Sequence, residues 1–118
     1  MRVIGKIGSL FQLNQEGGEI LIERDVERTL IRAVRKGGGL CLKFVSPGWA
    51  GAPDRLCLFP EGRGIFVELK RPGMTPRPLQ ARRAEQLKRL GFEVGLIDSK
   101  EEVEKFMAKV GGGAVDGP

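Results

Sequence analysis

The feature that most constrains the fold is a set of three short apolar runs, at about 40–45, 55–59 and 65–70. Runs of this length, bounded by glycine, proline and other turn residues, are typical of β-strands. The connections between them, 46–53 and 60–64, consist largely of turn residues. Short connections join antiparallel neighbours, so the three runs predict an antiparallel meander.

Helical patterns surround this meander. One helix is expected over about 22–36, before three consecutive glycines, and a second over about 79–90, before Gly91. A fourth strand at 92–97 then reaches the sheet through a helical crossover. A capping box of Ser99 and Glu102 opens a last helix. We therefore predict an α/β fold with an α-β-β-β-α-β core, a mixed central sheet flanked by helices, and a short C-terminal helix.

The 118 residues suffice for one domain. We expect a poorly ordered segment at 1–18, a folded domain at 19–110 and a flexible, glycine-rich tail at 111–118. No apolar run approaches the ~20 residues that span a membrane, and the first residues lack the long apolar stretch of a secretory signal. The expected location is therefore the cytoplasm.

The amino-acid composition excludes several kinds of catalytic and metal-binding site. The chain has no histidine, which excludes histidine-bound zinc and Ser-His-Asp triads. Twenty Lys and Arg against fifteen Asp and Glu give a net charge of +5, which favours a polyanionic partner such as nucleic acid. Cys41 and Cys57 fall in predicted strands, spaced for neither a zinc knuckle nor a redox pair. We expect two reduced, buried thiols.

Two acids lie on the apolar side of the first predicted helix, Glu23 and Glu27. Burying an ionised carboxylate without a partner costs several kcal/mol, so each needs a cation, a metal or a route to water. Glu23 is a candidate ligand or a complement to the helix dipole. Glu27 is a candidate catalytic acid or the partner of a neighbouring arginine.

Strand alternation places Glu68 and Lys70 on one face of the third strand, as a surface ion pair or a functional pair. Asp54 follows Pro53 at the start of the second strand and can lie beside Glu68 on its antiparallel neighbour. Two adjacent carboxylates disfavour joint ionisation unless a cation lies between them. Oxygen ligands without histidine or cysteine suit Mg²⁺ or Mn²⁺.

The 79–90 helix places polar side chains within or beside its apolar stripe. Arg83 can extend past apolar neighbours to solvent or contact a phosphate, and Gln80 can cap the first turn or face a substrate. Lys43, on the strand before the 46–53 loop, is a further candidate for phosphate contact. Trp49, within that loop, is interpreted either as a platform for an unpaired base or as a structural anchor.

Several of these residues match the sequence pattern of a known group of enzymes. Pro53-Asp54 followed by Glu68-Leu69-Lys70 matches the PD-(D/E)XK nuclease signature, and the surrounding segments closely resemble the VRR-NUC family over about 22–99. The short, stand-alone members found in phages and bacteria are most similar. The segments that carry the family resemblance are Gly38 to Phe44, Ser46-Pro47-Gly48, Gly51 to Arg55, Phe66 to Lys70, Pro78-Leu79-Gln80 and Leu90-Gly91-Phe92.

The resemblance implies a restriction-endonuclease-like fold and a structure-selective DNA endonuclease dependent on Mg²⁺ or Mn²⁺. It suggests a DNA-repair role and a homodimer acting on branched DNA such as Holliday junctions, in a bacterial or phage-infected cell. The implied metal ligands are Asp54, Glu68, the Leu69 carbonyl and Glu23. Lys70 is the implied catalytic lysine, Gln80 the glutamine of the following helix, and Glu27 the alternative helix-one acid.

For DNA contact we expect five residues, namely Lys43, Ser46, Trp49, Arg55 and Arg83. Nothing outside the core remains to read bases, so shape-selective binding through phosphates, weakened by salt, is predicted. Two rival hypotheses are a non-catalytic nucleic-acid-binding module on the same fold and a base-specific restriction enzyme.

Overall fold

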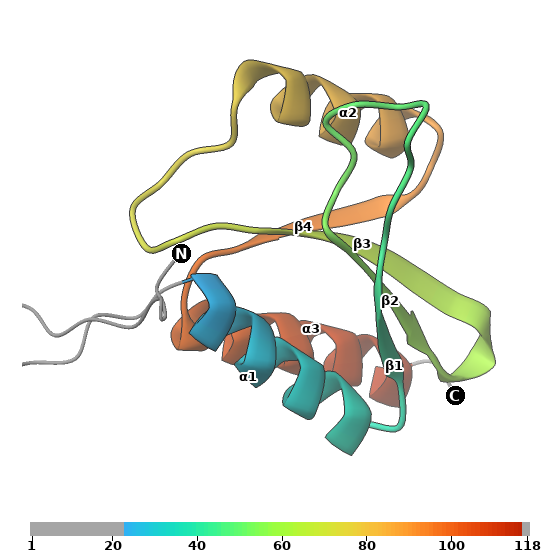
Figure 1. The fold of residues 1–118 in the computed structure, drawn as a ribbon. Coiled ribbons are helices and arrows are strands. Elements are labelled where there is room, and N and C mark those ends of the chain that lie inside the picture. Colours follow the sequence, from blue (N-terminus) through green and yellow to red (C-terminus); the bar gives the residue numbers. More distant parts are fainter. Residues whose placement is uncertain (1–22, 117–118) are drawn as a thin grey trace, which may run out of the picture.

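The computed structural model describes residues 23–116 and places one four-stranded sheet between two layers of helices (Figure 1). The strands are β1 (Leu40–Lys43), β2 (Arg55–Phe59), β3 (Arg63–Leu69) and β4 (Glu93–Ile97), adjacent in that order. The first three pair antiparallel, and β4 runs parallel to β3. The predicted meander, crossover and mixed sheet are confirmed.

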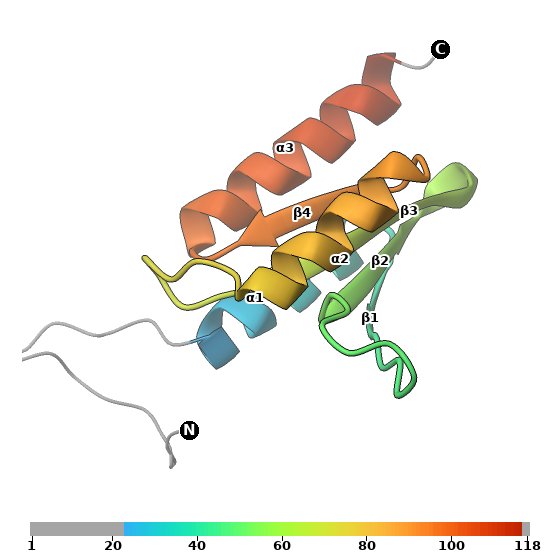
Figure 2. The same cartoon turned by 90° about the horizontal axis from the view of Figure 1, so that it is seen from above.

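Helices cover the two faces of the sheet unequally. Helices α1 (Glu23–Lys36) and α3 (Lys100–Asp116) lie together on one face, whereas α2 (Pro78–Arg89) covers the other (Figure 1). Seen from above, α2 runs beside β4 and leaves β1 and β2 uncovered on that face (Figure 2). Within the described residues, no helix combines the length and apolar character needed to cross a membrane.

The hydrophobic core lies between the sheet and the α1/α3 layer. Because side chains alternate along β3, Ile65, Val67 and Leu69 all face this core. The same alternation turns Phe66 and Glu68 toward the α2 layer. The other fully or nearly buried core side chains are Val26, Leu30, Val34, Cys57, Phe59, Ile97, Val103 and Val110.

Helix α1 ends at the run of three glycines, as the sequence predicts. Two of these glycines have separate roles. Gly38 has a φ of +87°, a left-handed conformation that suits a helix end. A Cβ atom on Gly39 would lie 2.4 Å from the carbonyl oxygen of Leu58, so only glycine lets β1 begin beside β2 here. The glycine run therefore both stops the helix and admits the edge strand.

Several element bounds differ from the predictions. Strand β1 ends at Lys43 instead of residue 45, and β3 begins at Arg63. Helix α3 continues to Asp116, into the predicted tail at 111–118, whose flexibility stays a prediction. Each residue added to an existing helix forms one further hydrogen bond, which offsets the low helix propensity of glycine. The predicted segment 1–18 lies outside the described residues.

Candidate active site

The two acids of the motif lie on neighbouring chain segments, Asp54 just before β2 and Glu68 near the end of β3. Arg55 of β2 pairs with Val67 of β3, which places Asp54, one residue earlier, opposite Glu68, one residue later. Residues directly opposite on antiparallel strands point to the same face with their Cβ atoms roughly 5 Å apart. The expectation that Asp54 lies beside Glu68 is met by this register.

Asp54 is anchored to the backbone of β3. Its Oδ2 accepts a hydrogen bond of 2.8 Å from the backbone N–H of Leu69. Burial raises the pKa of the Asp54 carboxyl above its ordinary value, while the Leu69 amide and the Lys70 ammonium oppose that rise. The fold therefore disfavours the ionised form of Asp54 and offers only partial electrostatic compensation for it.

Glu68 and Lys70 form an ion pair on the α2 side of the sheet. Glu68 is only 6% exposed, and its Oε2 lies 3.4 Å from the Nζ of Lys70. The backbone N–H of Lys70 donates to the carbonyl of Ile97 at 2.9 Å, so its backbone stays fixed where β3 ends. Both side chains are largely enclosed, so the interpretation of Glu68 and Lys70 as an exposed surface pair is wrong.

Gln80 connects this pair to α2. Its Oε1 accepts a hydrogen bond of 2.7 Å from the Nζ of Lys70 and another of 2.9 Å from the backbone N–H of Arg77. One oxygen thus caps the first turn of α2 and holds the lysine. The predicted cap is confirmed, and the predicted contact of Gln80 with a substrate stays a prediction.

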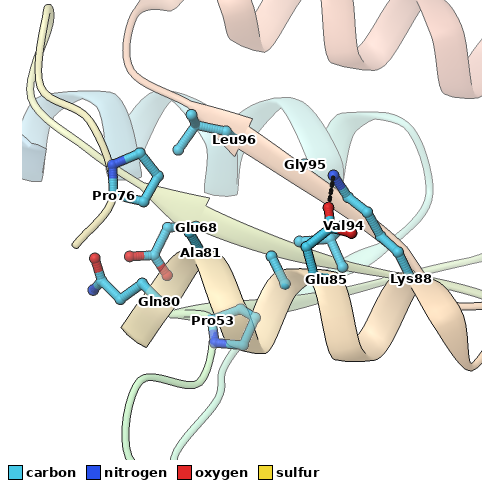
Figure 3. A pocket seen from close by; sticks show the side chains of 11 residues that line it. Pro53, Glu68, Pro76, Gln80, Ala81, Glu85, Lys88, Val94, Gly95 and Leu96 are labelled. Carbon is cyan, nitrogen blue, oxygen red and sulfur yellow. Dashed lines mark ion pairs between the residues drawn. The ribbon is translucent and has the colours of Figure 1, made fainter. Parts of the chain in front are cut away.

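The carboxylate of Glu68 opens into a cavity of about 240 Å³ between α2 and β4. Figure 3 shows Glu68 and Gln80 facing one another at one end, beside Pro53 and Pro76. At the other end Lys88 and Glu85 form an ion pair of 4.0 Å (Figure 3). Only one end of the cavity therefore carries the motif side chains.

The 46–53 loop, which leads to Asp54, contacts α2 through Arg83. The Nε of Arg83 donates to the carbonyl of Ala50 at 2.8 Å, and its guanidinium carbon lies 4.9 Å from the centre of the Trp49 ring. A Cβ atom on Gly51, whose φ is +85°, would lie 2.8 Å from Cγ of Leu79. These contacts match the interpretation of Trp49 as a structural anchor, and its predicted stacking on a base stays a prediction.

Glu27 and Arg55 form an ion pair on the opposite, α1 side. The Nε and Nη2 of Arg55 donate to the Oε2 of Glu27 at 3.0 and 2.7 Å. The Nη1 of Arg55 donates to the carbonyl of Cys41 at 3.2 Å. Of the two roles considered for Glu27, the structure shows the arginine partner. Three nitrogens of Arg55 thus bond within the chain, and its predicted contact with DNA stays a prediction.

The remaining predicted residues lie apart from this cluster. Glu23 begins α1, and the structure describes its backbone but not the placement of its side chain. Lys43 is exposed at the end of β1, on the edge of the sheet. The carbonyl of Ser46 accepts a hydrogen bond of 3.0 Å from the backbone N–H of Trp49. Their predicted roles in metal or DNA binding stay predictions.

The donor set fits a hard divalent cation. Across the described residues, no group of three or more His, Cys, Asp or Glu side chains gathers to hold a metal. The site itself offers two carboxylates, on Asp54 and Glu68. Mg²⁺ is commonly held by one or two carboxylates together with water and substrate phosphates, so two acids suffice. The raised pKa of Asp54 also marks a place where a cation would offset the cost of ionisation.

Comparison with known proteins agrees with this geometry. No family model matches the chain. A protein of Acyrthosiphon pisum secondary endosymbiont phage 1, named "Putative nuclease p44", is 46% identical over 82 residues, which cover 70% of this chain and 88% of that protein. A solved structure described as a VRR_NUC domain is 32% identical, with a TM-score of 0.70, and the match covers 73% of this chain and 94% of that one.

Proposed function

This chain belongs to the VRR-NUC family, and from that premise we propose that it is a metal-dependent endonuclease that cuts branched DNA such as a Holliday junction. The observation that carries the proposal is the meeting of Asp54, Glu68 and Lys70 at the ends of two paired strands. Two carboxylates can hold the metal ion that activates a water molecule, and an ammonium group can stabilise charge on the phosphate. The phage relative named as a nuclease supports the same activity.

The proposed cation site consists of Asp54, Glu68 and the carbonyl of Leu69, with Glu23 as the helix-one acid. In a strand, the N–H and C=O of one residue point to the same side. The Leu69 N–H reaches Asp54, so its carbonyl points toward the same acid. A bound Mg²⁺ or Mn²⁺ would acidify a water molecule and neutralise charge on the phosphate.

Lys70 is proposed to orient the attacking water or to stabilise the charge that develops on the phosphate. Its Nζ is held between Glu68 at 3.4 Å and Gln80 at 2.7 Å, so its position is fixed before substrate arrives. Gln80 acts as a positioning residue, because its oxygen is itself fixed by the first turn of α2. Asp54 is held in register by the Leu69 amide.

DNA would be held mainly through its phosphates. The net charge of +5 supports such binding, and its affinity should fall steeply with salt. Lys43, Ser46 and the Trp49–Arg83 pair are the proposed contacts. We also propose a homodimer, in which two sites would make paired cuts on a branched substrate, in the cytoplasm of a bacterial or phage-infected cell.

The test uses the full chain and a labelled four-way junction with Mg²⁺, with Mn²⁺ and with EDTA. Cutting with either metal and none in EDTA is expected. Lys70→Ala should lower the rate at least about 100-fold. Lys105→Ala, which changes an exposed lysine on α3, is the matched control and should cut at the wild-type rate. A junction that is bound normally and never cut would show a non-catalytic binding module instead.

The finer parts of the proposal have separate tests. A linear duplex of the same sequence should be cut more slowly than the junction, and equal rates would remove the preference for branched DNA. Junctions that differ only in sequence should be cut alike, and strong sequence dependence would indicate a restriction-like enzyme. Light scattering should give the mass of a dimer, and a monomer under cutting conditions would contradict the paired-site arrangement.

A further inference from the structure

The two cysteines of the chain lie directly opposite one another on neighbouring strands. Cys41 of β1 pairs with Cys57 of β2 in the antiparallel ladder. Their sulfur atoms are 3.7 Å apart, and the Sγ–H of Cys57 donates to Sγ of Cys41. The sixteen-residue separation in sequence conceals this contact, which only the strand register creates.

The ladder also identifies the type of pair. Phe44 and Asp54 continue the same register, and the N–H of Phe44 donates to the carbonyl of Asp54 at 2.9 Å, which marks a hydrogen-bonded pair. Pair types alternate along an antiparallel ladder, so Cys41 and Cys57, three positions on, form a non-hydrogen-bonded pair. The Cα atoms of such a pair lie about 4.5 Å apart, within the roughly 4.4–6.8 Å that a disulfide spans.

The two thiols differ in accessibility and acidity. Cys41 is partly exposed, whereas Cys57 is fully buried. The hydrogen bond from Cys57, aided by the nearby Arg55 guanidinium, lowers the pKa of the Cys41 thiol below its ordinary value. That same contact and burial raise the pKa of Cys57. Cys41 is therefore the better nucleophile and the first thiol to react with an oxidant from solution. Cys57, which stays protonated, lies next to it.

We propose that Cys41 and Cys57 are an oxidative modification site, at which a small disulfide converts the two thiols into a reversible intramolecular disulfide. With oxidised glutathione, the Cys41 thiolate attacks one sulfur and releases glutathione as thiolate. Cys57 then loses its proton, attacks the Cys41 sulfur and releases the second glutathione. The chain loses two electrons and two protons, and oxidised glutathione becomes two reduced molecules.

The disulfide would restrict the segment that contains Asp54, one of the two acids of the proposed active site. It would close a loop from Cys41 to Cys57, and this loop contains 46–53 and Asp54. Strand β1 is a short edge strand that pairs only with β2 among the described strands. Linking them would keep β1 in register and restrict the loop that leads to Asp54. The proposal stands on the register and the sulfur contact, so it is independent of nuclease activity.

The test equilibrates the reduced full chain with a series of reduced and oxidised glutathione mixtures, followed by acid quenching, alkylation in denaturant and mass spectrometry. Since the chain has two cysteines, each state is distinct. The expected product lacks two hydrogens, takes up no alkylating agent and runs as a monomer on a non-reducing gel. Digestion should yield one peptide pair joined through Cys41 and Cys57, and dithiothreitol should restore both thiols.

Single substitutions separate the roles of the two thiols. In Cys57→Ser, Cys41 keeps its exposure but lacks its partner, so a stable adduct with one glutathione should accumulate. In Cys41→Ser, the buried Cys57 should stay unmodified. Circular dichroism establishes that each variant is folded. The proposal is overturned if the wild-type chain keeps two alkylatable thiols in the most oxidising mixture, stops at the glutathione adduct, or forms only disulfides between chains.

Discussion

Replacing Glu27 and Glu23 by glutamine, one at a time, tests which acid of helix α1 contributes to stability and which to activity. Glu27 lies one turn after Glu23 on the apolar side of the helix, so either could serve as the helix-one ligand of the proposed nuclease. The structure gives the Glu27 carboxylate a different partner, because Arg55 donates two hydrogen bonds to its Oε2. We therefore expect Glu27→Gln to change stability and Glu23→Gln to change activity.

The size of the stability effect follows from the geometry of the pair. The side chain of Arg55 is 13% exposed and that of Glu27 is 32% exposed, so solvent screens the pair only in part. Glu27→Gln keeps an amide oxygen as acceptor and loses the ionic part of the bonds, about 1 kcal/mol. Glu27→Ala removes the acceptor and leaves Arg55 mostly buried without it, at a cost of about 2–3 kcal/mol.

Urea unfolding and thermal melting measure these costs, and about 1 kcal/mol should lower the melting temperature of a domain of this size by roughly 4–8 °C. Cutting of the four-way junction is then measured well below the melting temperature of each variant. Glu27→Gln should retain wild-type activity within about threefold, whereas Glu23→Gln should lose at least about 100-fold. A folded Glu27→Gln protein that does not cut would refute the reasoning and make Glu27 the ligand.

Two further substitutions test the site. Burial raises the pKa of Asp54 in the folded chain, so its contribution to stability is complete below about pH 4 and is lost as pH rises through the folded pKa. Asp54→Asn should therefore abolish cutting yet unfold at higher urea than the wild type at pH 7, with the difference shrinking toward pH 4; equal midpoints at both pH values would contradict this. Gly51→Ala should destabilise the chain by about 1–3 kcal/mol, because its φ of +85° is unfavourable for alanine and the added Cβ would lie 2.8 Å from Leu79. Gly48→Ala, where an added Cβ meets nothing, is the control, and equal melting temperatures would contradict the proposed loop contact.

The strand order and the placement of the motif acids were predictable because both depend on local patterns. Alternation along 65–70 places Glu68 and Lys70 on one face, and a short turn after β2 brings Asp54 opposite Glu68. The pairing of the cysteines was not predictable from their spacing. It depends on the register between β1 and β2, which is set by the length of the 46–53 loop and by the contact of Gly39 with Leu58.

Arg55 shows a second limit of pattern reasoning. The sequence predicts a contact of Arg55 with DNA, and alternation along β2 also places it on the same face as the buried Cys57. This alternation can be recognised in the sequence, and it favours a partner for Arg55 on the face of the sheet that packs against α1 and α3. The identity of the partner, Glu27, required the packing of α1 against the sheet. Long side chains choose among several nearby partners, and sequence alone does not order those choices.

The alternation of the sheet also explains why the motif needs an apolar residue between its glutamate and its lysine. Glu68 and Lys70 point to the α2 side only if the residue between them points to the core, and Leu69 is 2% exposed there. The same residue offers its N–H to Asp54. Burial of the Leu69 side chain therefore fixes the backbone that holds Asp54 and sets the direction of Glu68 and Lys70. Packing on one face of β3 thus determines the geometry of the chemical groups on the other.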